Sequence, residues 1–405
     1  MRDLTVLVNA GPWLPVPPDG YGGIENVVAA LVPELRARGV RVVLATTGSS
    51  TLPADEYLSV FPDGQYAHIQ SPYNQVMGIA HAHVRAVLER LRRRGDVHLV
   101  HDHMEVVGPA VLTAAGSDIP PVLHTLHWDL GKHPDFYAGF AGNGRVFVNG
   151  VSASQLERAP AALRAHSAGH AHLATPLAVD ADRRGGPAKR PHFAAVGRIT
   201  ALKGTHIAAR TCRRLGLPLV LAGPVNGIDS AEELERVLAD RGDPRHGAPD
   251  VRYYAEQVRP HVDGDLVRWV GTVAGAELEE LLATARAALF PVQWAEPGGT
   301  AVVEALACGA PAVGFARGCL PELVRHGRTG LLARTEEEFE AALHRTAEID
   351  PADCRKEAAA RFTPAVMAER YLELYERVLS GAGGAAVPAP RVAGQSGRRS
   401  SRATG

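Results

Sequence analysis

The sequence predicts an α/β protein with two domains, each built on a doubly wound parallel sheet. Short apolar segments alternate with segments whose apolar residues recur at helical spacing, in two successive series. With 405 residues, the chain is too long for one ordinary domain. Asp180 to Pro191 separates the two series and has no apolar periodicity. Parallel strands need long crossover connections, and the intervening helices supply them.

The first series predicts a domain over residues 1–180. A glycine- and proline-rich loop follows the first strand and leads into a helix over residues 24–35, and another helix is expected over 79–93. Strands are expected at residues 5–9, 40–46, 98–101, 122–126 and 146–151. Residues 181–191, rich in Asp, Arg, Gly and Pro, are expected to form the linker to the second domain.

The second series predicts a domain over residues 192–362. A final amphipathic helix is expected over 363–380, and the Gly/Ala/Pro/Ser/Arg-rich residues 381–405 are expected to be a disordered tail. Strands are expected at residues 192–196, 218–222, 267–270, 287–290 and 312–315. Two such sheets facing each other leave a cleft at the carboxyl ends of their strands, where open α/β sheets bind ligands.

Composition narrows the class of protein. The formal net charge of −1 gives no general attraction to nucleic acid, so no nucleic-acid partner is expected. The four cysteines have no metal-ligand spacing and indicate a reducing compartment. The sequence shows no signal peptide and no apolar run that could span a bilayer. We therefore expect a cytoplasmic enzyme.

The segment from Trp294 to Gly309 carries the most informative pattern. Two carboxylates, Glu296 and Glu304, flank the turn Gly298-Gly299, which opens a short helix at Thr300. Acids are common near helix starts, but this pairing is more specific. The free amides of the helix start can hold a phosphate. One carboxylate can bind the diol of a ribose and the other the hydroxyls of a sugar, so the segment suits a nucleotide-sugar.

Two cations follow the expected strand 192–196. Arg198 and Lys203, five residues apart, can hold a diphosphate and stabilise the charge it gains on leaving a sugar carbon, without a metal. A solvated basic loop has the same composition. The neighbouring pattern around Glu296 and Glu304 favours the diphosphate site.

The spacing from Glu296 to Glu304 resembles the Glu-x7-Glu signature of retaining glycosyltransferases with the GT-B fold, most closely family 4. The resemblance runs from Leu4 to about Leu379 and implies two Rossmann-like domains facing a central cleft, with a last helix that returns to the first domain. It is also carried by Tyr21-Gly22-Gly23-Ile24-Glu25, Gly197-Arg198, Lys203-Gly204, Val270-Gly271-Thr272-Val273, Leu320-Pro321-Glu322-Leu323-Val324, Gly327 and Thr329-Gly330-Leu331-Leu332.

The resemblance also implies roles for individual residues. Arg198 and Lys203 would bind the donor diphosphate, Glu304 the nucleotide ribose and Glu296 the transferred sugar. His127 would lie beside the reacting sugar. The donor site would be completed by Gly22, Gly23, Gly298, Gly299 and Thr300, and the catalytic set would be Glu296, His127, Arg198 and Lys203. Family members usually carry Phe or a similar residue where this chain has Gly298, so we expect a roomier or more mobile pocket on the sugar side.

Three other patterns favour structural interpretations. The many histidines lack cysteine partners and a His-Glu-x-x-His pattern, so no metal site is expected. Asp263-Gly264-Asp265 precedes a strand and is interpreted as a turn, not as a metal-binding Asp-x-Asp. Arg85, Arg90, Arg92, Arg93 and Arg94 are interpreted as cations at a helix carboxyl end, in preference to contact with an anionic membrane.

The expected function is that of a hexosyltransferase using a nucleotide-diphosphate sugar, with UDP favoured, and a hydroxyl of a small-molecule or glycan acceptor. Retention would follow from front-face attack, with no cofactor. The loops 57–73 and 128–144 are the expected acceptor walls. A sugar-nucleotide epimerase or phosphorylase on the same fold, and a non-catalytic sugar-nucleotide-binding protein, are the alternatives.

Overall fold

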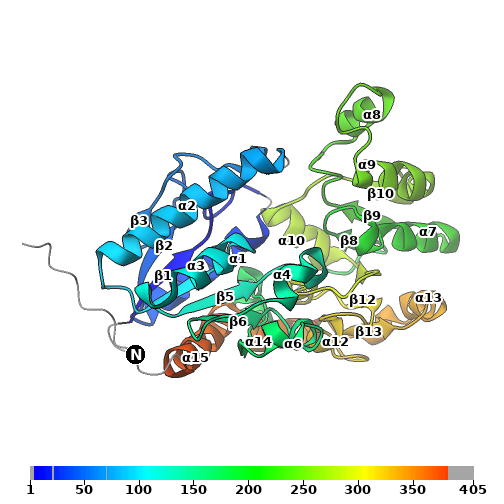
Figure 1. Ribbon diagram of the computed structural model, residues 1–405. Helices are drawn as coiled ribbons and strands as arrows, with labels where there is room; N and C mark the ends of the chain where they lie inside the picture. The colour runs from blue at the N-terminus through cyan, green and yellow to red at the C-terminus, as the bar shows by residue number, and fades with distance from the viewer. Residues whose placement is uncertain (1–3, 21, 70, 382–405) are drawn as a thin grey trace, which may run out of the picture.

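Buried apolar strands form two separate parallel sheets, one in each half of the chain (Figure 1). The computed structural model describes residues 4–20, 22–69 and 71–381. Tyr21 of the family motif and nearly all of the expected tail, residues 382–405, lie outside the described residues. Two Rossmann-like lobes lie side by side, as the sequence predicts.

The N-terminal lobe contains a seven-stranded sheet in the order β3-β2-β1-β4-β5-β6-β7. Alternate residues of one strand enter opposite cores: Val6 and Val8 pack with α1, and Leu7 packs with α2 and α3. The strands are β1 Thr5–Asn9, β2 Arg41–Ala45, β3 Glu56–Leu58, β4 Leu99–Asp102, β5 Val122–Leu126, β6 Val146–Gly150 and β7 Ser167–His170. The helices are α1 Gly23–Ala37, α2 Tyr73–Arg93, α3 Val107–Ala115, α4 Pro134–Ala138, α5 Ala153–Glu157 and α6 Ala161–Arg164.

The C-terminal lobe contains a six-stranded sheet in the order β10-β9-β8-β11-β12-β13. Its strands are β8 Phe193–Val196, β9 Leu219–Ala222, β10 Val267–Trp269, β11 Ala288–Phe290, β12 Ala312–Phe315 and β13 Gly330–Ala333. Its helices are α7 Thr205–Leu215, α8 Ala231–Ala239, α9 Pro249–Tyr253, α10 Gly275–Thr284, α11 Thr300–Ala307, α12 Leu320–Leu323, α13 Glu336–His344 and α14 Pro351–Arg361. The segment 263–265 forms a turn before β10, where the Asp263 carboxylate accepts the amides of Asp265 and Val267.

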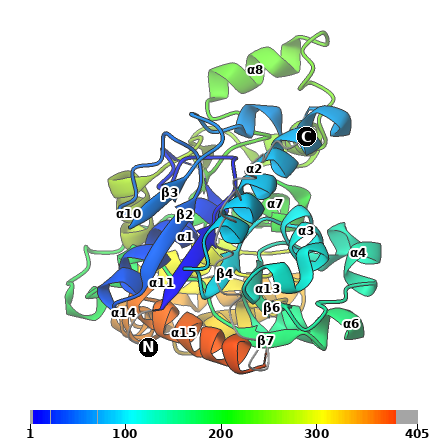
Figure 2. The same cartoon turned by 60° about the vertical axis from the view of Figure 1, so that its left-hand side comes forward.

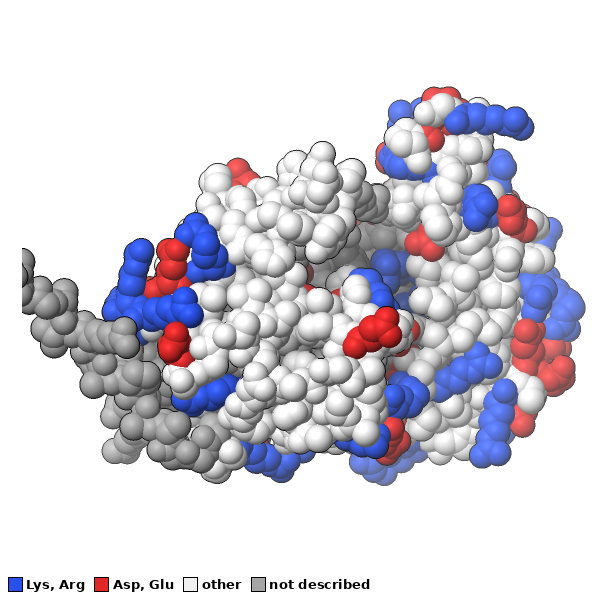
Figure 3. Space-filling model, in the orientation of Figure 1, with Lys and Arg blue, Asp and Glu red and all other residues white. Residues whose placement is uncertain are grey.

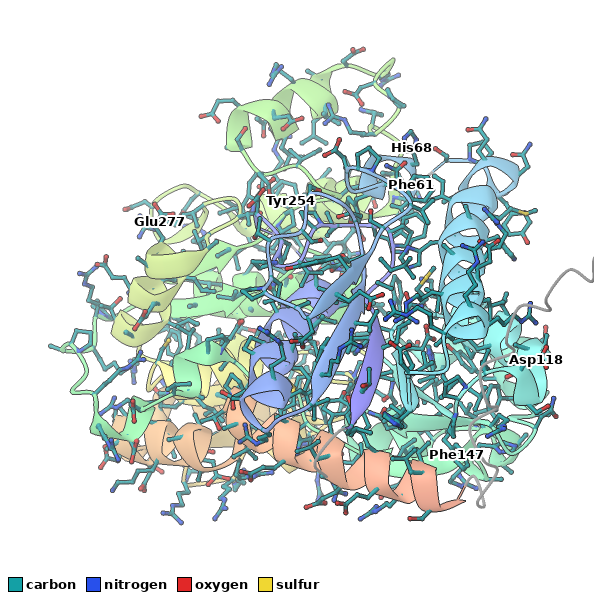
Figure 4. All side chains as sticks on the ribbon, turned by 90° about the vertical axis from the view of Figure 1, so that its left-hand side faces the viewer. Phe61, His68, Asp118, Phe147, Tyr254 and Glu277 are labelled. Carbon is teal, nitrogen blue, oxygen red and sulfur yellow. The ribbon has the colours of Figure 1, made fainter. Side chains whose placement is uncertain are left out.

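The chain passes between the lobes twice. Ala174 belongs to the N-terminal core and Ala178 to the C-terminal core, so the first passage lies between these two residues. The second passage separates α14 from α15 (Pro364–Gly381), which packs against the N-terminal lobe (Figure 2). Tyr371 and Tyr375 of α15 are fully buried in the core of that lobe. Figure 4 shows α15 running along the N-terminal lobe, with Phe147 of β6 near its end.

Each sheet reverses its strand order at one point, between β1 and β4 in the first sheet and between β8 and β11 in the second. Ligands of open α/β sheets bind beyond the carboxyl ends of strands at such points. Figure 3 shows the molecule hollowed between the two lobes, with basic side chains inside the hollow.

The arginines of the basic stretch are paired with acids. Arg90 lies between Glu56 and Asp96, and Arg94 contacts the same two carboxylates. Basic and acidic side chains therefore mix on the surface at this end of α2 (Figure 3). Within the described part of the chain, no helix is both long and apolar enough to cross a membrane.

Candidate active site

Two predicted site residues meet at the point where the strand order of the second sheet reverses. Lys203 follows β8 and Glu296 follows β11, the two strands at the reversal. The Lys203 Nζ lies 2.7 Å from Glu296 Oε2, and the Trp294 indole donates to the same oxygen at 2.9 Å. Glu296 is 7% exposed. These contacts fix the orientation of the carboxylate in a nearly buried site.

Gly204 makes this loop geometry achievable. Its φ is +69°, and a Cβ at this position would lie 1.9 Å from the carbonyl oxygen of Pro291. Only glycine allows both this backbone conformation and this close approach. The approach brings the loop after β8 against the loop after β11.

The helix α11 begins at a glycine turn beside Glu296. Gly299 precedes Thr300 with a φ of +63°, and a Cβ there would lie 2.7 Å from Leu323 Cδ1. The first bonds of the helix run from the amides of Val302 and Val303 to the Gly299 carbonyl. The amides that precede them, at Thr300 and Ala301, are those that a bound phosphate could accept from.

The interpretation of Gly298 as a source of extra pocket space is wrong. A Cβ at position 298 would lie 2.6 Å from Leu173 Cδ1 and 3.2 Å from Val151 Cγ2, both in the N-terminal lobe. Gly298 is buried. The volume that a larger residue would occupy is filled by the opposite lobe, so the glycine permits contact between lobes.

Glu304 has an unusual environment for a carboxylate. It lies on α11, and burial raises its pKa from 4.5 to about 7. No hydrogen bond to its side chain occurs within the described residues. A partly buried acid without a partner keeps its full capacity to accept hydrogen bonds from a ligand.

Arg198 is exposed at the end of β8 and lies near the N-terminal lobe. The pKa of Lys132, which follows β5, is lowered by burial and also by the charge of Arg198, whereas Glu105 opposes the decrease. Arg198 likewise acts on Asp250 of its own lobe. The charge of Arg198 therefore acts on groups of both lobes, and the guanidinium forms no ion pair in the described structure.

His127 lies at the carboxyl end of β5, in contact with other histidines. Its Nε2 is 2.8 Å from His103 Nδ1, and the two rings stack with centroids 5.1 Å apart. His101 continues the row, 4.1 Å from His103 by ring centroid, and its Nδ1 is 2.8 Å from the hydroxyl of Tyr375. Burial and the nearby His124 lower the pKa of His127 to about 3. His127 is therefore neutral at physiological pH.

The helix α5 ties the two lobes together near the site. The Glu322 carboxylate of the C-terminal lobe accepts the amides of Ala153 and Ser154 at 2.9 and 2.7 Å, at the start of α5. It also lies 2.9 Å from His172 Nε2. Gln155 of the same helix donates to the carbonyls of residues 126 and 128, on both sides of His127.

Glu322 also belongs to a cluster of metal-ligating residue types, although the sequence predicts no metal site. Ligand atoms of His170, His172 and Glu322 lie within 4.8 Å of one another. Both carboxylate oxygens already accept hydrogen bonds. Arg370 donates to the carbonyl of His170 and Arg361 to that of Glu322, so cationic groups surround the cluster. The arrangement is that of a contact between lobes.

Gly22 and Gly23 lie at the start of α1, beyond β1. A Cβ at Gly22 would be 2.5 Å from Pro18 Cγ, whereas Gly23 is exposed with open space beside it. Among the described residues, no backbone hydrogen bond joins these glycines to the C-terminal lobe. The structure thus joins Lys203 to Glu296 directly and leaves Gly22, Gly23 and His127 on the opposite side of the hollow.

Sequence reasoning assigned no individual role to four residues of this region. His103 holds His127, Trp294 holds Glu296, and Glu322 joins the lobes. Glu105 lies beyond β4 at the reversal point of the first sheet. A position just after an apolar strand was the one signal that could have indicated His103 and Glu105.

Comparisons with known proteins agree with this architecture. Residues 180–361 match the family model for glycosyl transferases group 1, and residues 21–176 match the model for Glycosyltransferase Family 4. A glycogen synthase of Mycobacterium tuberculosis H37Rv is 29% identical over 389 residues, covering 85% of this chain and 86% of that protein. A D-inositol 3-phosphate glycosyltransferase of Pseudarthrobacter chlorophenolicus is 26% identical over 355 residues, with coverages of 77% and 78%.

Solved structures show the same fold. A glycosyltransferase involved in avilamycin A biosynthesis superposes with a TM-score of 0.59 and 25% identity. The match covers 93% of this chain and 98% of that one.

Proposed function

The chain is a glycosyltransferase of the family 4 type with a GT-B fold, and we propose that it transfers a hexose from a nucleotide-diphosphate sugar with retention of anomeric configuration. The observation that carries the proposal is the contact of Lys203 with Glu296 beside the free amides of α11. A cation, a sugar-binding carboxylate and phosphate-binding amides are thereby gathered at one strand-order reversal.

The proposed donor contacts all three of these groups. Its diphosphate binds Lys203, Arg198 and the first amides of α11, with Gly298, Gly299 and Thr300 forming the turn around it. The ribose diol binds the unpartnered carboxylate of Glu304, and the hexose hydroxyls bind Glu296. We propose a uridine nucleotide by analogy with the family.

The proposed reaction needs neither a metal nor a covalent intermediate. The bond from the anomeric carbon to the phosphate oxygen breaks, and Lys203 and Arg198 stabilise the charge that accumulates on the diphosphate. The acceptor oxygen attacks the anomeric carbon from the same face. Its proton passes to the departing phosphate oxygen, so the products are a nucleoside diphosphate and a glycoside. His127, neutral with a pKa of about 3, serves as a hydrogen-bonding group for the sugar and not as an acid.

The related proteins indicate which acceptors to test first. One is named as a glycogen synthase and another as an inositol phosphate glycosyltransferase. We therefore propose a polyhydroxylated acceptor bound in the N-terminal lobe. A cytoplasmic location accords with Cys212, Cys308, Cys319 and Cys354, which are all buried free thiols.

A thermal-shift screen with UDP-, ADP-, GDP- and dTDP-sugars tests the donor assignment. A ligand at 100 times its Kd stabilises the native state by about 2.7 kcal/mol, which raises the melting temperature measurably. We expect one nucleotide-sugar to raise the melting temperature of the wild type and not of Lys203→Ala. Product analysis then distinguishes a transferred sugar from an epimerised or phosphorolysed donor. If no nucleotide-sugar shifts the wild-type melting temperature, the proposal is refuted.

A further inference from the structure

A strained turn holds an acidic residue at the reversal point of the first sheet. Glu105 follows β4, and the next residue, Val106, has φ 60° and ψ −60°. The amide of Val107 donates to the Glu105 carbonyl at 2.6 Å, which closes a γ-turn with positive φ. This conformation is costly, especially for a β-branched residue, and such strain is concentrated at functional sites.

The Glu105 side chain is nearly buried but incompletely paired. It is 12% exposed, and its Oε1 accepts the hydroxyl of Tyr137 at 3.1 Å. Its Oε2 lies 3.9 Å from the Nζ of Lys132, which is too far for a direct hydrogen bond. Burial raises the pKa of Glu105 to about 7, and the charge of Lys132 opposes this increase. An acceptor oxygen and an ammonium therefore face each other with unused hydrogen-bonding capacity.

This pair borders the hollow between the lobes. Lys132 is 46% exposed, and its Nζ lies 3.3 Å from the ring centroid of Trp128, itself 38% exposed. Across the hollow is Arg198, whose charge acts on Lys132. Glu105 lies where the strand order of the first sheet reverses, and Lys203 and Glu296 lie where that of the second sheet reverses. The carboxylate–ammonium pair therefore lies on the acceptor side of the proposed donor.

We propose that Glu105 and Lys132 form the acceptor subsite, and that they bind the vicinal diol of a pyranose or cyclitol. One hydroxyl donates to Glu105 Oε2 and the adjacent hydroxyl oxygen accepts from Lys132 Nζ. A diol supplies this donor and acceptor in a fixed relation, and the gap of 3.9 Å leaves both groups free to be bridged. The proposal rests on the proposed function, because it assigns the acceptor of the same reaction.

Glu105→Gln and Lys132→Met test the subsite. Glutamine keeps the shape and can still accept from Tyr137, so the variant is expected to fold. The assay measures nucleoside diphosphate release from the nucleotide-sugar identified by thermal shift. Acceptors are D-glucose, maltose, myo-inositol and their phosphates. Glu376→Gln, at an exposed position on α15 and outside the two expected acceptor walls, is the control.

We expect both subsite variants to raise the acceptor KM at least tenfold, while the nucleotide-sugar still raises the melting temperature of each variant. An unchanged acceptor KM with intact donor binding overturns the subsite, as does the failure of every polyol to stimulate the wild type. If no nucleotide-sugar raises the melting temperature of the wild type, the result refutes the proposed function instead of the subsite.

A pH profile gives an independent readout. Because the carboxylate form accepts the hydroxyl, the acceptor kcat/KM is expected to rise with pH through about 7, the pKa of Glu105. Lys132, Tyr137, His124 and Asp129 also act on this carboxyl electrostatically, so the assignment depends on the variant. The rise should disappear in Glu105→Gln, and a profile that keeps it contradicts the role of Glu105.

Discussion

Replacing Glu304 should stabilise the unliganded protein and abolish its response to the donor. Burial raises the pKa of this carboxyl from 4.5 to about 7. Because the folded pKa exceeds the unfolded one, the folded state holds the proton more tightly between pH 4.5 and about 7, and stability falls as pH rises through this window. Glu304→Gln removes this dependence.

The magnitude follows from the size of the pKa change. One pKa unit corresponds to 1.36 kcal/mol, so the ionised carboxylate destabilises the folded state by up to ~3 kcal/mol at pH 8. The glutamine amide also lacks a partner, which costs about 1 kcal/mol. The net gain of ~2 kcal/mol predicts a melting temperature roughly 4–8 °C higher at pH 8. At pH 5 the wild-type carboxyl is mostly protonated, and the gain should vanish.

The assay is a melting curve at pH 5 and pH 8 with and without the nucleotide-sugar. Charge-assisted hydrogen bonds from the ribose contribute about 1.5–3 kcal/mol each, so the variant should lose the donor-induced rise. Glu277→Gln, at an exposed position on α10 (Figure 4), is the control and should behave as wild type. A difference between variant and wild type that is the same at both pH values would refute the assigned cause, and a retained donor response would refute the ribose contact.

Three further substitutions test the site and the contact between lobes. Lys203→Ala and Glu296→Gln should each lower the rate of transfer at least 100-fold, which corresponds to roughly 3 kcal/mol of transition-state stabilisation. The circular dichroism spectrum should be unchanged. Near-normal turnover in both variants would show that the site is misassigned. Gly298→Phe should lower both the activity and the melting temperature, because the new side chain meets Leu173. Adding Leu173→Ala to this variant should restore part of each. A Gly298→Phe protein as active as wild type would contradict the close contact. Glu322→Ala should reduce the free energy of unfolding by ~2 kcal/mol or more, because it leaves two amides of α5 unpaired. It should also raise the radius of gyration measured by small-angle scattering. An unchanged radius would show that this contact does not hold the lobes together.

The sequence predicts the central strands well and the edge strands poorly. The strand expected at 218–222 is found as β9, and that expected at 287–290 as β11, because unbroken apolar runs are typical of strands buried on both faces. β3 and β7 escape prediction. Each is short and lies at a sheet edge, and in β3 Glu56 pairs with arginines instead of packing in the core. β13 falls within a family motif and was not recognised as a strand.

In the candidate site, the sequence likewise predicts the features that depend on neighbouring residues and not the contacts between distant ones. Local spacing indicates the turn at Gly298–Gly299 and the helix at Thr300, because these depend on neighbouring residues. The contact between Lys203 and Glu296 joins residues 93 positions apart, and it depends on how two sheet loops approach at Gly204. Gly298 was misinterpreted for the same reason, since Leu173, which fills its space, comes from the other lobe. For Glu105 the sequence offers only its position shortly after a strand, and the strand order then places this residue at the reversal point of the first sheet.

The position of α15 bears on how the protein reaches its native state during synthesis. Tyr371 and Tyr375, which follow the C-terminal lobe in the sequence, complete the core of the N-terminal lobe. The hydroxyl of Tyr375 lies 2.8 Å from His101, the last ring in the row that contains His127. The N-terminal lobe therefore cannot finish folding until the whole C-terminal lobe and α15 have left the ribosome. Truncation before Pro364 should consequently damage the acceptor half of the enzyme, although the deleted residues follow the donor half in the sequence.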